Sequence, residues 1–305
     1  MPARLRIVVV GDSAFVADVV VPELVAHDRD HEVVGTIGEA VVRAAERPVD
    51  LVITGLTTSV AEDLDALRRI RRTRPDAKLL VLSPTGTSQD VIDAIRGHAF
   101  AVCQIPCSAP ELASLIELAL DTPHWSDGIE LLSASPVWIE VRASCQMVTA
   151  DRLVHFMDAL GCDLAPDTRT AISTAFRELL LNAIEHGGQF DPSRHVTITC
   201  VRTDGAIIYL IRDPGHGFSL SSLPHAALSN PEGEPAKHME HRERLNLRPG
   251  GFGLLLARGL VDHIVHNEHG NAVMLVKYLD QSGEHPQASA PPQEVEPVPR
   301  PVRPA

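Results

Sequence analysis

The chain has 305 residues, 44% of them apolar, which is enough to bury the cores of two domains of ordinary size. Its 27 basic and 40 acidic residues give a formal net charge of −13, which argues against a general nucleic-acid or anionic-membrane surface. The start of the sequence shows neither a secretory leader pattern nor a bilayer-spanning stretch. We therefore expect a cytoplasmic protein that binds neither nucleic acid nor membrane directly. Five cysteines without a C-x-x-C pair favour reduced, packed thiols over disulfides or a zinc site.

Residues 1–122 alternate short aliphatic runs with amphipathic segments. The runs predict strands at 5–10, 33–36, 51–54, 79–82 and 101–104, and the segments between and after them predict helices at 14–27, 37–45, 61–72, 88–97 and 109–120. Continuous apolar strands that alternate with helices are typical of a parallel sheet covered on both faces. We expect a doubly wound α/β domain with five strands.

Residues 123–136 contain Pro123, Gly128 and Pro136 and predict a linker. A second α/β domain then follows over 137–280. It has predicted strands at 137–141, 196–201, 207–211 and 272–278 and predicted helices at 149–160, 166–186 and 253–265. The turn at 203–205 favours an antiparallel hairpin. Residues 281–305 hold seven of the 23 prolines and predict a disordered tail.

Three motifs of the second domain indicate a nucleotide site. The first places Glu178 and Asn182 four residues apart on one helix, where a solvated polar stripe explains them equally well. The second is Asp213-Pro214-Gly215-His216-Gly217 after a strand, where a carboxylate can accept a hydrogen bond from an exocyclic amine and glycines allow close approach of the backbone. The third is Gly250-Gly251-Phe252-Gly253 at the start of a helix, which suits phosphate. Three such motifs in this order favour ATP.

With these motifs, residues 137–279 resemble the GHKL (Bergerat-fold) ATPase domain of the anti-sigma-factor serine kinase type, an α/β sandwich. The resemblance implies that Asn182 ligates Mg²⁺, that Asp213 reads adenine, and that Glu178 is the general base toward a substrate hydroxyl. It further implies a nucleotide-binding role for the turn and loop residues Gly215, Gly217, Gly251, Phe252 and Gly253. In the polar lid segment before the third motif, we expect Arg248 to contact phosphate.

The resemblance implies an ATP- and Mg²⁺-dependent serine/threonine protein kinase in a bacterial partner-switching circuit. Its protein partner would be an antagonist with a phosphorylatable Ser or Thr, and a sigma factor is a second candidate partner. Two alternatives stay open: a nucleotide-gated interaction module with little phosphoryl transfer, and a non-classical two-component ATPase domain. A homodimer is also open.

Residues 4–120 resemble a response-regulator receiver domain, through residues 7–12, 50–56, 81–83 and 105–112. In that family an acidic pair holds magnesium, an aspartate accepts phosphate, a hydroxyl assists and a lysine pairs with the phosphoryl group. The matching positions here are Gly11 with Asp12, then Gly55, Ser83 and Ile105. Gly55 has no carboxylate and Ile105 no cation, so we predict no aspartyl phosphorylation. The implied role is constitutive docking or dimerisation, through the last helix and strand face.

Overall fold

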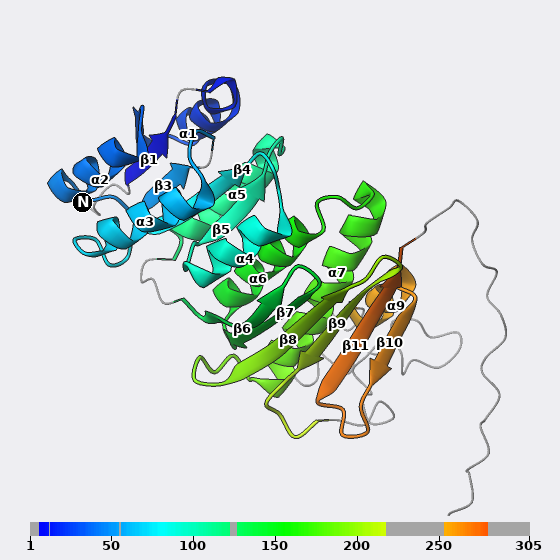
Figure 1. The fold of residues 1–305 in the computed structure, drawn as a ribbon. Helices are drawn as coiled ribbons and strands as arrows, with labels where there is room; N and C mark the ends of the chain where they lie inside the picture. The colour runs from blue at the N-terminus through cyan, green and yellow to red at the C-terminus, as the bar shows by residue number, and fades with distance from the viewer. Residues whose placement is uncertain (1–5, 12, 55, 123–126, 218–252, 280–305) are drawn as a thin grey trace, which may run out of the picture.

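The computed structural model describes residues 6–11, 13–54, 56–122, 127–217 and 253–279. The described residues fold into two α/β domains, each built on its own sheet (Figure 1). None of the helices in these ranges has the length and apolar character that crossing a membrane would require.

The first domain is a parallel sheet with strand order β2-β1-β3-β4-β5. This is the doubly wound order of flavodoxin and CheY, so the predicted fold class is confirmed. The strands are β1 (Arg6–Val10), β2 (Asp30–Val34), β3 (Leu51–Thr54), β4 (Lys78–Ser83) and β5 (Ala101–Gln104). The helices are α1 (Val21–Ala26), α2 (Ile37–Glu46), α3 (Val60–Arg71), α4 (Ser88–Arg96) and α5 (Ala109–Leu120).

One predicted helix of this domain is irregular. The segment 14–27 contains a π-helical turn, η1 (Val16–Val20), before α1. Pro22 stands in the first turn of α1 and has no backbone N–H to donate, so the regular hydrogen-bond ladder cannot run through this point. The apolar periodicity predicted a single helix over 14–27, but periodicity cannot distinguish a π-helical turn from an α-helical one.

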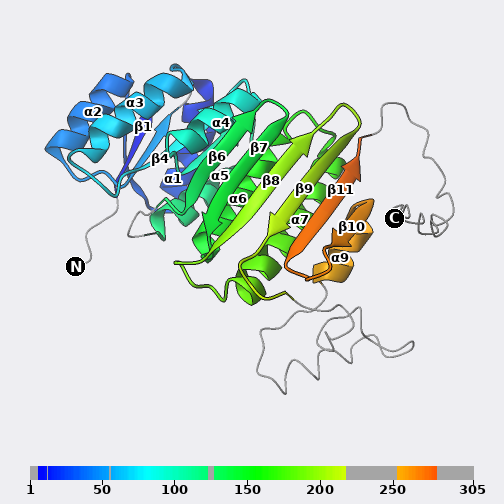
Figure 2. The ribbon, with the colours of Figure 1, turned by 60° about the horizontal axis from the view of Figure 1, so that its bottom comes forward.

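The second domain is an antiparallel sheet with strand order β10-β11-β9-β8-β7-β6 and helices packed on one face (Figure 2). The helices are α6 (Met147–Leu160), α7 (Pro166–Asn182) and α9 (Gly253–Leu260), and a π-helical turn η2 (Ala183–Gly187) extends α7. The strands are β6 (Ile129–Ser135), β7 (Trp138–Ser144), β8 (His195–Arg202), β9 (Ala206–Arg212), β10 (His263–His266) and β11 (Ala272–Tyr278).

Two predictions for this domain are corrected. The segment 123–136, predicted as a linker, contains strand β6, which pairs with β7 and forms the edge of the sheet. The helix predicted over 253–265 ends at Leu260, and His263–His266 instead form β10 against β11. Pairing with β11 supplies hydrogen bonds that the sequence alone does not reveal, and it outweighs helical propensity.

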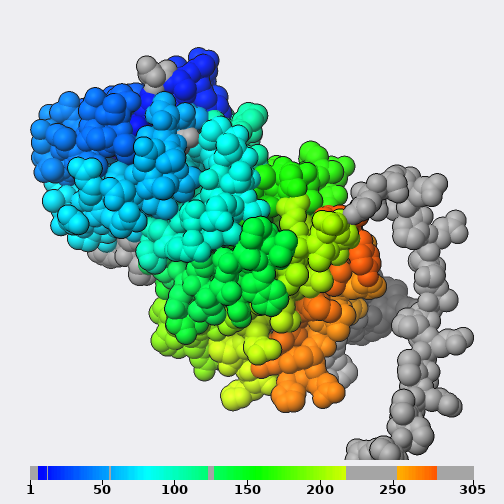
Figure 3. All heavy atoms as spheres, viewed as in Figure 1, coloured from blue at the N-terminus to red at the C-terminus, as the bar shows by residue number. Residues whose placement is uncertain are grey.

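The two domains pack directly against each other (Figure 3). In their interface α4 and β5 of the first domain contact β6 and α6 of the second. Arg152 of α6 lies at its centre, with 2% of its side chain exposed. Its guanidinium donates to the backbone oxygens of Ala99 and Phe100 at 3.0 and 2.8 Å, and to Asp127 Oδ1 at 3.0 Å. Because each of the three guanidinium nitrogens donates a hydrogen bond, the buried charge is paired and holds α6 against the first domain.

Candidate nucleotide site

The first predicted motif lies along one face of α7. Glu178, Asn182 and Glu185 of the following turn are half-buried, while Phe176 and Leu180 on the opposite face are buried in the core. This division follows from the 3.6-residue period of the helix. The polar face therefore lines a protected surface rather than open solvent.

The second motif meets the end of this helix. Asp213 follows β9, and its Oδ1 accepts the Gly215 N–H at 2.8 Å. Gly187 packs so closely on the Asp213 carboxylate that a Cβ at Gly187 would overlap it, and Gly215 in turn lies against Gly187. Burial raises the pKa of Asp213, and the bond from Gly215 opposes that rise. Among the described residues no hydrogen bond reaches the second oxygen of this half-buried carboxylate, and a ligand donor could use it.

The third motif brings the start of α9 to the same place. Gly253 opens α9, which packs on α7, and a Cβ at Gly253 would overlap the Glu178 carboxylate. A helix start exposes backbone N–H groups and carries positive dipole charge. Glu178 thus lies next to a helix start whose N–H groups can donate hydrogen bonds to phosphate.

The β10–β11 turn supports the Asp213 loop, and sequence reasoning missed it. Asn271 O accepts the Asp213 N–H at 3.0 Å, and the Gly217 Cα, in a left-handed backbone with φ of 80°, packs on the His269 carbonyl. Asn267 Oδ1 accepts the N–H groups of Asn271 and Ala272, both at 3.0 Å. Two asparagines that flank Gly270 between two strands are typical of a tight turn, and this pattern was the available sequence signal for it.

The structure thus brings Glu178, Asn182, Asp213, Gly215 and Gly253 to one region, with Gly217 in the loop that follows. The predicted residues Arg248, Gly251 and Phe252 lie outside the described residues.

The comparison with protein families covers this same region. Residues 145–277 match the histidine kinase-like ATPase domain. These residues form a domain of that family. The match begins at the buried Cys145, which packs against Gly188 at the end of η2, and it ends in β11.

Curated proteins with similar sequences agree with this assignment. The serine-protein kinase RsbW of Oceanobacillus iheyensis is 28% identical over 155 residues, which are 50% of this chain and 87% of that protein. The anti-sigma F factor of Geobacillus kaustophilus is 27% identical over 123 residues, or 39% of this chain and 76% of that protein.

The chain is also similar to a transcriptional regulator and, in its first domain, to solved receiver structures. The transcriptional regulator NtrC of Azospirillum brasilense is 33% identical over 73 residues, which are 24% of this chain and 15% of that protein. A CheY-like receiver domain from Methanospirillum hungatei is similar at 19% identity and a TM-score of 0.36, covering 39% of this chain and 95% of that one. A Thermotoga maritima response regulator gives 22% identity and 0.36, with 38% and 98% covered.

The residues of the histidine kinase-like ATPase domain fit an adenine nucleotide. Asp213 offers an acceptor, Gly187 and Gly215 allow the first and second motifs to pack closely around that carboxylate, and the start of α9 offers donors. Across the described ranges, no three His, Cys, Asp or Glu side chains gather into a metal cluster. Asn182, half-buried on α7, is the residue that would ligate Mg²⁺.

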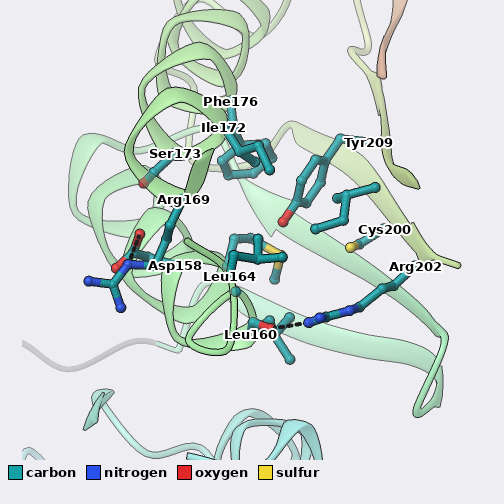
Figure 4. A pocket seen from close by; sticks show the side chains of 13 residues that line it. Asp158, Leu160, Leu164, Arg169, Ile172, Ser173, Phe176, Cys200, Arg202 and Tyr209 are labelled. Atoms are coloured by element: carbon teal, nitrogen blue, oxygen red, sulfur yellow. Dashed lines mark hydrogen bonds and ion pairs between the residues drawn. The ribbon is translucent and has the colours of Figure 1, made fainter. Parts of the chain in front are cut away.

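A pocket beside this domain's core is separate from the nucleotide site (Figure 4). It lies between α6, the N-terminal half of α7 and the β8–β9 hairpin, where Phe176 and Tyr209 pack with ring centroids 4.8 Å apart. Its cavity of about 30 Å³ holds roughly two waters. That volume excludes a nucleotide, so the pocket is a packing gap.

In the first domain, a buried acid lies beside the end of β3. Ser83 Oγ accepts the Gly86 N–H at 2.9 Å, so it holds the β4–α4 loop. Asp63 of α3 is fully buried near Thr54 at the end of β3, accepts a hydrogen bond from Thr58, and has its pKa raised by burial. Asp12 and Gly55 lie outside the described residues, and the absence of aspartyl phosphorylation remains a prediction.

Proposed function

We propose that the protein is an ATP- and Mg²⁺-dependent serine/threonine kinase of the partner-switching type, acting in the cytoplasm on an antagonist protein. The observation that carries the proposal is the position of Glu178, whose carboxylate lies against Gly253 at the start of α9, where phosphate would bind. The RsbW relative, whose name denotes a serine-protein kinase, supports this choice.

The proposed chemistry is mainly positioning and electrostatics. Asp213 would hold the adenine amine, and the first N–H groups of α9 would hold phosphate oxygens. Bound Mg²⁺ would neutralise phosphate charge, with Asn182 as its protein ligand. Glu178 would accept the proton of the substrate hydroxyl as the γ-phosphoryl group moves to that oxygen. The lid residue Arg248 would add positive charge, in keeping with the sequence prediction.

The test is transfer of radiolabelled γ-phosphate to partner proteins encoded next to this one, with and without Mg²⁺. We expect Glu178→Gln to lower the transfer rate about 10²- to 10⁴-fold, as loss of a general base does, while ATP affinity changes little. Glu140→Gln is the matched control, because Glu140 is a half-buried glutamate of β7 in the same domain, on the sheet away from α7.

If the protein binds ATP but transfers no measurable phosphate to any partner, and the wild type and Glu178→Gln behave alike, the kinase proposal is wrong. The protein would then be a nucleotide-gated interaction module. Failure to bind adenine nucleotides, with Asp213→Asn making no difference, would refute both functions. A sigma factor as direct partner and a homodimer are further parts of the proposal, measurable by solution mass with and without partner.

A further inference from the structure

A cleft at the border of the two domains has a cavity volume of about 450 Å³. Its walls come from the β4–α4 loop and the end of β5 in the first domain, and from the β6–β7 turn, the α6–α7 loop and the β8–β9 turn in the second. Cavities of about 300–1,000 Å³ at domain borders commonly hold small molecules. The cleft adjoins the turn before β9, whereas Asp213 of the nucleotide site follows the far end of that strand. The two sites are therefore separate.

One wall of the cleft is held together by contacts around Gly86. Cys162 of the α6–α7 loop donates a hydrogen bond to the Gly86 oxygen at 2.9 Å, which joins the second domain to the β4–α4 loop of the first. Gly86 has a left-handed backbone with φ of 56°, and a Cβ there would overlap the side chain of Gln104. The glycine thus allows the Gln104 side chain to pack against the loop and line the cleft.

The charged groups of the cleft disfavour a charged ligand. Arg202 donates to both oxygens of the Asp163 carboxylate and to the Leu160 oxygen at 3.0 Å, so its charge is already paired. Asp204 adds a second carboxylate to the lining, and an anion would meet this charge. The described residues also form no cluster of acidic, His or Cys side chains that would hold a metal ion. An uncharged ligand fits these walls best.

The neutral groups of the cleft are open to such a ligand. Gln104 is half-buried, and among the described residues no hydrogen bond reaches its side-chain amide. In the same ranges none reaches the hydroxyl of Ser88, whose backbone N–H at the start of α4 has no acceptor within the helix. An amide and a hydroxyl both donate and accept, as sugar hydroxyls do. Pro136 and the 59% exposed Val137 add an apolar wall that suits the C–H groups of a sugar ring.

We propose that this cleft binds an uncharged carbohydrate of about one or two rings. Gln104 and Ser88 of the first domain would bond its hydroxyls, and the β6–β7 turn of the second domain would cover its C–H groups. Because the ligand would touch both domains, its binding would stabilise their interface by mass action. The nucleotide site takes no part, so the proposal does not depend on the kinase proposal.

The experiment titrates the full chain with glucose, galactose, maltose and trehalose up to roughly 10 mM, ten times a Kd of about 1 mM, and follows binding by saturation-transfer NMR. We expect at least one of these sugars to bind saturably. The bound sugar should slow the alkylation of Cys162 by iodoacetamide, because Cys162 lines the cleft. Alkylation of Cys107, a half-buried cysteine of the first domain outside the cleft, should not change. Inorganic phosphate should not protect Cys162.

Variants test the two polar contacts. Gln104→Leu removes the amide at similar size and should weaken sugar binding about 2- to 10-fold, as loss of a neutral hydrogen bond does, and Ser88→Ala should act in the same direction. Gln89→Leu is the matched control and should bind as the wild type does, since Gln89 is the exposed neighbour of Ser88 and does not line the cleft.

Three results would overturn the proposal: no binding of any of the four sugars, a bound sugar that leaves the alkylation of Cys162 unchanged, or Gln104→Leu that binds as tightly as the wild type. Protection of Cys162 by phosphate and not by sugar would also refute it, because the cleft would then be an anion site. The wild-type titration and alkylation decide the matter even where a variant fails to fold.

Discussion

Replacing Arg152 by methionine is the sharpest test of the domain arrangement. The guanidinium is almost fully buried, makes two hydrogen bonds across the interface and a third to Asp127 beside β6, and lies 5.1 Å from the ring centre of Phe100. Methionine fills much of the same volume but leaves two carbonyl oxygens and the Asp127 carboxylate without this donor. Removing one partner of a buried ion pair costs roughly 3–5 kcal/mol, and we expect the lower end, about 3 kcal/mol, because Asp127 also pairs with His98.

The assay is urea unfolding of the full chain, followed by circular dichroism. The variant should unfold at lower urea, and its two domains should separate into two transitions because their shared interface is lost. Arg152→Lys keeps the charge but cannot reach all three acceptors, so its stability to urea should lie between those of the wild type and Arg152→Met. Arg142→Ala is the control: Arg142 pairs with Glu130 on the surface, with side chains 49% and 56% exposed, so its loss should cost about 0–1 kcal/mol. A single transition of Arg152→Met within about 1 kcal/mol of the wild type would refute the reasoning.

Three further outcomes follow from the two domains. Asp213→Asn should weaken ATP binding about tenfold or more, since a hydrogen bond to a charged acceptor contributes about 1.5–3 kcal/mol, and calorimetry measures it; an unchanged Kd would remove Asp213 from the site. Gly187→Ala should weaken ATP binding because its Cβ would displace the Asp213 carboxylate, whereas Gly205→Ala, which meets no neighbour, should leave the affinity unchanged. Burial raises the pKa of Asp63 in the folded protein above its value of about 4 in the unfolded chain. The contribution of protonated Asp63 to the free energy of unfolding is therefore complete below about pH 4 and is lost as the pH rises through the pKa of the folded state. Asp63→Asn should therefore gain stability over the wild type as pH rises above about 4 in thermal melts; parallel pH curves for the two proteins would contradict this.

The strands of the first domain could be predicted because each is a continuous apolar run. All four residues of β3 and all six of β4 are buried, as strands covered on both faces must be. β6 could not be found in this way. It is an edge strand with alternating and partly polar residues, lies between Gly128 and Pro136, and is recognisable only through its pairing with β7.

The candidate site also combines features that the sequence predicts with features that only the fold reveals. The spacing of Glu178 and Asn182, and the Asp213 turn, are local patterns, and each is visible in the chain by itself. That Gly187 packs on Asp213, and that Glu178 lies against Gly253, are tertiary contacts between segments far apart in sequence. The Asn267–Asn271 turn behind Asp213 was likewise hidden, because its value depends on which strand end it meets.

The structure also limits how the first domain can dock or dimerise. The face predicted for this role combines α5 with β5, but β5 packs against α6, which Arg152 holds in place. A second copy that used the whole face would have to displace α6. At the other side of the sheet β2 is an edge strand, and the exposed Val33 on β2, Val25 on α1 and Val42 on α2 belong to that half of the domain. Because α6 also packs on α7, a displacement of α6 by changes in the first domain would reach the helix that carries Glu178 and Asn182.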